Sequence, residues 1–141
     1  MKYLKKYNES VDSKLLELQE FCNSYLAYLI DAGFSVKCNH PSHYDENENM
    51  INIQKLIAPN NGLIKRGSFS WNQIKDDFIP FYDVLSKKYS VSFTTTLLQT
   101  TFNISSDSDV SISYSDILED KVNYIINNAI IKNILIKVKN K

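Results

Sequence analysis

The sequence is poor in the residues that would mark a disulfide-stapled domain or a glycine-rich nucleotide loop. It contains two cysteines, three glycines and three prolines in 141 residues. Two cysteines cannot build the disulfide framework of a small secreted domain, so we expect a reducing, cytoplasmic location. The three dispersed glycines leave no room for a glycine-rich phosphate loop, and no catalytic or cofactor motif is recognisable.

Net charge and long apolar runs are also missing. Basic and acidic residues number 16 each, so the net charge is zero and gives no strong signal for nucleic acid or an anionic membrane. No apolar run approaches 18 residues, and the start lacks the apolar core of a signal peptide. We therefore expect neither secretion by that route nor a membrane span. The lysine-rich end, 137–141, is typical of a solvated basic tail.

What the chain does have is strong hydrophobic patterning, enough for a single domain over 1–141 with a packed core. Apolar residues at spacings of three and four predict a helix over 11–32, capped by Ser10, Asp12 or Ser13 and ended by Gly33. Residues that alternate between apolar and polar then predict a hairpin of two strands, at 34–38 and 51–57, with a long acidic connection.

The second half repeats this change of period. A short strand at 63–67 precedes a Ser70–Gln73 capping box, which predicts a helix to about Tyr89 that Pro80 kinks or divides. Residues 91–104 are strongly β, and their change of apolar phase predicts a bulge or tight turn near 97–100.

A loop at 105–109 is then expected to lead into a strand at 110–114. Ser115 is expected to cap a last helix, and residues 134–138 either form a closing edge strand or extend that helix. The predicted order is α-β-β-α-β-β-α, with or without a final β. Hairpins separated by helices favour an α+β fold, an antiparallel sheet with helices on one face.

One compact cluster of metal-ligand residue types occurs, formed by Cys38, His40 and His43. Cysteine and histidine are the ligands that zinc prefers, and Asp45 or Cys22 would be the fourth. The same histidines would serve a metal-assisted phosphoesterase. Structural zinc sites usually join two separated segments, however, so a solvent-facing loop that contains histidines is the alternative interpretation.

A second candidate site is a basic turn that leads into a capped helix. Asn61, Lys65 and Arg66 lie just before the helix start at Ser70, where free N–H groups favour an anion. Trp71, at the first helical position, could stack on a base. These five residues form a candidate site for a small anionic ligand or a nucleotide phosphate, and a simple basic turn is the alternative.

The first nine residues, MKYLKKYNE, carry a resemblance. The pattern of Met1, Lys2, Leu4, Tyr7 and Glu9 is similar to the N-terminal lead of internal head proteins of T4-like tailed phages. In that family the lead targets the protein to the capsid and is cleaved after the Glu. The resemblance implies an accessory phage protein in an infected bacterial host, with residues 1–10 as a flexible or cleavable lead, or alternatively a virion component packaged with DNA.

Together these observations favour a non-enzymatic binding protein. We expect it either to sequester a small, for example cyclic, nucleotide used as a defence signal or to inhibit a host protein, and to do so as a homo-oligomer. The phosphoesterase and the internal virion protein remain the alternatives.

Overall fold

The computed structural model has an α+β fold. It describes residues 2–40, 48–57, 65–101, 104–126 and 130–140, and within them the side chains of 13–40, 48–57, 67–97, 109–125 and 130–140. Asn61, His43 and Asp45 therefore lie outside the described residues. The order of elements is α-α-β-β-β-α-β-β-α-α-β, which confirms the predicted fold class.

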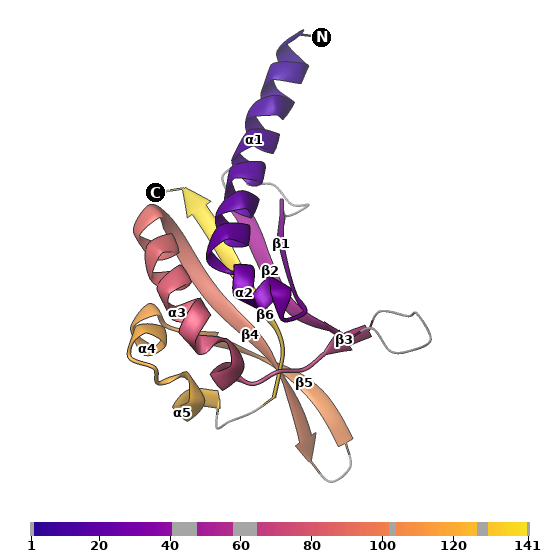
Figure 1. The fold of residues 1–141 in the computed structure, drawn as a ribbon, viewed down its shortest axis with the longest axis vertical. Helices are drawn as coiled ribbons and strands as arrows, with labels where there is room; N and C mark the ends of the chain where they lie inside the picture. Colours follow the sequence, from indigo (N-terminus) through magenta and orange to yellow (C-terminus); the bar gives the residue numbers. More distant parts are fainter. Residues whose placement is uncertain (1, 41–47, 58–64, 102–103, 127–129, 141) are drawn as a thin grey trace.

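The described strands form one antiparallel sheet (Figure 1). Its main path runs in the order β1-β2-β6-β4-β5, and a short β3 pairs with β2 beyond the end of β6. The strand bounds are β1 Phe34–Asn39, β2 Glu48–Ile57, β3 Lys65–Gly67, β4 Tyr89–Thr101, β5 Ile104–Ile112 and β6 Ile130–Asn140. The predicted β1–β2 hairpin is confirmed, with Val36 opposite Ile53.

The helices pack on one face of this sheet, which we call the covered face (Figure 1). Their bounds are α1 Lys2–Tyr25, α2 Ala27–Asp31, α3 Trp71–Lys88, α4 Tyr114–Leu118 and α5 Val122–Ile126. The core lies between helices and strands, where α3 contributes six buried residues. Phe78, for example, lies within 5.4–5.8 Å, ring centre to ring centre, of Trp71, Phe81, Tyr82 and Phe93.

The predicted helix ends are partly right. Gly33 has a φ of 98° and ends α2, as predicted. Helix α1 begins at Lys2 and not at Val11, because no proline or glycine interrupts residues 2–25. Ser10, Asp12 and Ser13 thus lie inside α1 and do not cap it. Pro80 lies inside α3, which is not divided there.

The C-terminal third differs more from the prediction. Residues 105–109, predicted as a loop, belong to β5, and the predicted irregularity is a register shift between β4 and β6 at Thr96/Leu97. The last helix is two short ones, with Ser113 rather than Ser115 as the cap of α4. Residues 137–140 are part of β6, so the predicted basic tail is wrong there. The predicted strand at 134–138 is confirmed as a strand, but it is central in the sheet and not at its edge.

None of the described helices is both long enough and apolar enough to cross a lipid bilayer.

Candidate binding face of the sheet

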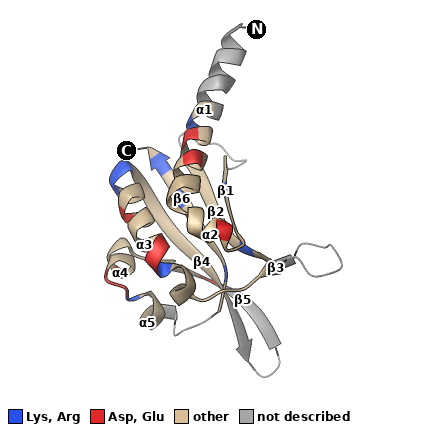
Figure 2. Ribbon diagram, in the orientation of Figure 1, with Lys and Arg blue, Asp and Glu red and all other residues tan. Residues whose placement is uncertain are grey.

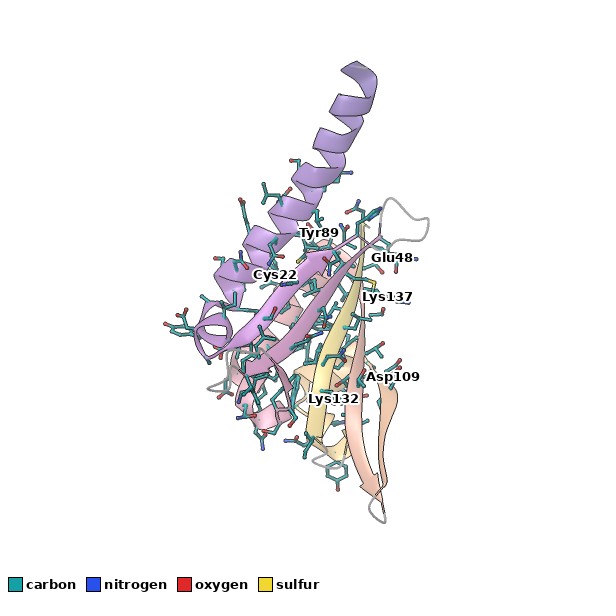
Figure 3. All side chains as sticks on the ribbon, turned by 90° about the vertical axis from the view of Figure 1, so that its right-hand side faces the viewer. Cys22, Glu48, Tyr89, Asp109, Lys132 and Lys137 are labelled. Atoms are coloured by element: carbon teal, nitrogen blue, oxygen red, sulfur yellow. The ribbon has the colours of Figure 1, made fainter. Side chains whose placement is uncertain are left out.

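The face of the sheet opposite the helices, the uncovered face, is polar. Because side chains alternate along a strand, Ile51 and Ile53 point into the core while Asn52 and Gln54 point the other way. The same alternation in β6 buries Ile136 and Val138 and leaves Lys137 and Lys139 exposed. Figure 3 views the molecule with the strands in front, and Glu48 and Lys137 lie close together at one end of the sheet.

Strand register groups these polar side chains into rows across the sheet. Glu48 lies opposite Lys139, which lies opposite Ser90. In the next row Lys137 lies between Met50 and Ser92. Two further rows follow toward the other end of the sheet: Lys37–Asn52–Leu135–Thr94–Ser111 and Ser35–Gln54–Asn133–Thr96–Asp109.

The first two rows surround a hollow, which we call the lysine hollow. Its volume is about 340 Å³, and it is lined by Glu48, Ser90, Val91, Ser92, Lys137 and Lys139. Glu48 Oε2 lies 3.9 Å from Lys139 Nζ, and the side chain of Lys139 is 53% exposed. Figure 2 shows this end of β6 in the blue of lysine. Ammonium and hydroxyl groups gathered in one recess are suited to bind an anion.

A second feature of the uncovered face is a pair of amide oxygens without partners. Asn52 Oδ1 and Asn133 Oδ1 are buried, and neither has a hydrogen-bond partner in the described part of the chain. Asn133 lies opposite Gln54, so the two asparagines are diagonal neighbours on adjacent strands. Buried polar atoms are nearly always hydrogen-bonded in proteins. The middle of this face therefore has two free acceptors.

Trp71, predicted as a base-stacking residue, has no exposed surface. Its indole Nε1 donates a hydrogen bond to Asp120 Oδ1 at 3.2 Å, and Lys75 Nζ lies 3.0 Å from Asp120 Oδ2. The Lys75 ammonium first, and then the indole N–H, hold the pKa of the Asp120 carboxyl below its usual value. The prediction that Trp71 stacks on a base is therefore wrong, because its ring lies in the core and joins α3 to the turn before α5.

Of the other residues of the predicted anion turn, only Ser70 has a described side chain. Ser70 is exposed. Its backbone N–H donates a hydrogen bond to Gln73 Oε1 at 2.9 Å, which confirms the Gln73 half of the predicted capping box. Lys65 and Arg66 belong to β3, and their side chains lie outside the described residues, as does Asn61. The anion turn therefore stays a prediction for those three residues.

The predicted metal cluster is also only partly described. Cys38 points into the covered face and is 8% exposed, while His40 is exposed with its Nδ1 3.1 Å from Glu48 O. Across the ranges described above, no three or more His, Cys, Asp or Glu side chains come close enough together to hold a metal ion. The contribution of His43 and Asp45 stays a prediction.

The lysine hollow is not predicted from the sequence, although the alternation of residues in β6 gives a partial signal for it. Residues 134–139 read Ile-Leu-Ile-Lys-Val-Lys, an alternation that in a strand places Lys137 and Lys139 on one face. The pairing of Lys139 with Ser90 and of Lys137 with Ser92 could not be predicted. The local sequence of a strand does not determine which distant strand it pairs with.

Comparison of the chain with protein-family models, with curated proteins and with solved structures gave no match.

Proposed function

We propose that this protein is a non-enzymatic binding protein that takes up a small anionic ligand of the nucleotide class in the lysine hollow. The observation that carries the proposal is the placement of Lys137 and Lys139 beside Ser90 and Ser92 in one recess. Two like charges on one face attract an anion, and lysine is a common phosphate ligand in proteins. A recess of about 340 Å³ also falls in the range of small-ligand sites.

The proposed site is the lysine hollow and not the predicted anion turn, but the class of ligand is the predicted one. The N-terminal resemblance supports an origin in a phage, where sequestering a cyclic nucleotide would remove a defence signal from the infected host. The lack of a glycine-rich loop supports binding without turnover, because nothing in the sequence provides the machinery of a nucleotide-hydrolysing loop.

A host protein as the bound partner is the second candidate. Two tyrosines support it, because Tyr124 is 93% exposed and Tyr28 is 79% exposed. Tyrosine is enriched where proteins recognise one another. The two residues lie on different helices, α5 and α2, so they give the partner no single groove.

Thermal unfolding in the presence of a cyclic dinucleotide or a nucleoside triphosphate tests the first candidate. Binding to the folded state should raise the melting temperature in proportion to the logarithm of ligand concentration. Replacing both hollow lysines, Lys137→Ala with Lys139→Ala, should abolish that rise.

A matched control separates contact from overall charge. Lys37→Ala removes one positive charge from the same face, on β1, outside the lysine hollow. It should leave most of the ligand-induced rise intact, and Lys137→Ala alone should not. Equal losses in the two single variants would mean that only the net charge matters, and an unchanged rise in the double variant would exclude the hollow.

A further inference from the structure

The junction of α1 with the edge strand β1 contains the two cysteines of the chain. Cys22 Sγ and Cys38 Sγ are 3.6 Å apart, and the residues are 0% and 8% exposed. Cys22 comes from the last turn of α1, and Cys38 from the end of β1. Figure 3 marks Cys22 where α1 meets the strands. Both are free thiols.

Gln19 holds this junction together from the helix. Its Oε1 accepts a hydrogen bond from Cys38 N at 2.8 Å, and its Nε2 donates to Val36 O at 2.9 Å. The side-chain amide thus satisfies backbone groups on the free edge of β1, as a neighbouring strand would. These two bonds, to Cys38 N and to Val36 O, fix the end of β1 against α1 beside the two sulfurs.

Of the two cysteines, Cys38 is the one that borders a hollow. A hollow of about 290 Å³ opens beside it, lined by Leu15, Leu16, Gln19 and Cys38. Cys22 does not line this hollow and has no exposed surface. A hydrogen bond from the Cys22 thiol lowers the pKa of Cys38, and the same bond with burial raises that of Cys22. Cys38, the cysteine beside the hollow, is thus also the one favoured as a thiolate, the reactive form.

We propose that Cys38 and Cys22 form a peroxide-reactive dithiol, in which Cys38 is the attacked thiol and Cys22 the resolving one. The Cys38 thiolate attacks a hydroperoxide oxygen, an S–O bond forms, and the O–O bond breaks to release an alcohol or water after protonation. Cys22 then loses its proton, its sulfur displaces the hydroxyl of the Cys38 sulfenic acid, and water leaves. The hydroperoxide is reduced and the two thiols become one disulfide.

The geometry suits this second step. A disulfide needs a sulfur–sulfur distance of about 2.05 Å. The two sulfurs are already in contact at 3.6 Å, so only a small approach is needed and no side chain lies between them. The bond would tie α1 to β1 and close the chain segment that contains α2 and Gly33. Such a crosslink restricts the unfolded chain and should stabilise the folded one.

The test treats the full, reduced chain with a small excess of hydrogen peroxide and then maps the cysteines by mass spectrometry after thiol blocking. The expected product is a monomer about 2 Da lighter, with a peptide that links Cys22 to Cys38 and a melting temperature raised by several degrees. A sulfinic acid on Cys38 beside a free Cys22 would overturn the proposal. So would a disulfide between two chains, or two thiols that do not react.

Two single variants assign the roles. In Cys22→Ser the sulfenic acid on Cys38 should persist long enough to be trapped by a 1,3-dicarbonyl reagent, because the resolving thiol is missing. In Cys38→Ser the remaining Cys22 should stay reduced, because it has no exposed surface. A Cys22 that reacts at the wild-type rate in Cys38→Ser would reverse the assignment and contradict the proposed order of attack.

Discussion

The two faces of the sheet differ in almost every physical property. The covered face is built from isoleucine, valine and phenylalanine that pack against α1 and α3, and Ile51, Ile134 and Ile136 have no exposed surface. The uncovered face, formed by the alternate residues of the same strands, contains lysine, serine, threonine and asparagine in rows. We infer that the first face carries most of the stability and that the second is free to bind.

The largest effect is expected where the covered face is most crowded. Phe78→Ala removes a fully buried ring with four aromatic neighbours, so it should lower the free energy of unfolding by about 3–5 kcal/mol. Urea unfolding followed by tryptophan fluorescence measures this. On the uncovered face, Thr94→Ala should change stability by less than about 1 kcal/mol. Similar losses in the two variants would contradict the inference that the covered face carries most of the stability.

A smaller loss is expected at the edge of the core. Trp71→Phe removes the hydrogen bond to Asp120 and part of the buried ring, so it should cost about 2 kcal/mol. The pKa of Asp120 is lowered in the folded state, so its contribution is present above the unfolded pKa and is lost as the pH falls below about 4.

Unfolding curves at pH 6 and pH 3 check the sign of this effect. Wild-type protein should lose more stability between the two pH values than Asp120→Asn, in which no carboxyl titrates. If Asp120→Asn shows the larger pH dependence, the account of the Trp71–Asp120–Lys75 contacts is wrong.

Removing an unpartnered amide from the uncovered face should raise the stability of the protein. Asn52→Val removes a buried oxygen that has no partner among the described residues and adds a residue favoured in strands. We expect the free energy of unfolding to rise by about 1 kcal/mol. Gln54→Val, on the same strand and face, is the matched control, and its gain should be smaller. Denaturant titrations of both variants give the difference, and a clear loss in Asn52→Val would show that this amide has a partner.

The smallest effect concerns charge in the lysine hollow. Glu48→Gln removes the carboxylate that lies 3.9 Å from Lys139. A partly exposed ion pair at this distance is worth less than about 1 kcal/mol, so affinity for an anionic nucleotide should rise about twofold to threefold. Isothermal titration at low and moderate salt measures it. Weaker binding in Glu48→Gln would mean that the carboxylate itself contacts the ligand.

Much of the covered face could be predicted from local pattern, and little of the uncovered one could. The spacing of Ile74, Phe78 and Phe81 places the core stripe of α3, and the alternation at Ile51 and Ile53 places a strand. Local pattern does not contain strand order, which is why β6 was expected at an edge and is central. The prediction of a basic tail over 137–141 fails at Lys137 and Lys139 for the same reason.

Trp71 shows a second limit of local pattern. A position at the start of a helix suggested an accessible ring, but Asp120, 49 residues further along the chain, supplies the partner for its indole N–H. The contact between Cys22 and Cys38 is of the same kind, since α1 and β1 must pack before the two sulfurs meet. Sites that join distant segments depend on tertiary packing.

Mapping the amide resonances during titration with a cyclic dinucleotide tests the central claim most directly, that the uncovered face binds and the covered face stabilises. We expect the largest shifts at Ser90, Ser92 and Lys137, with little change at the buried residues of α3. Shifts concentrated between Lys65 and Trp71, or spread through the core, would contradict it.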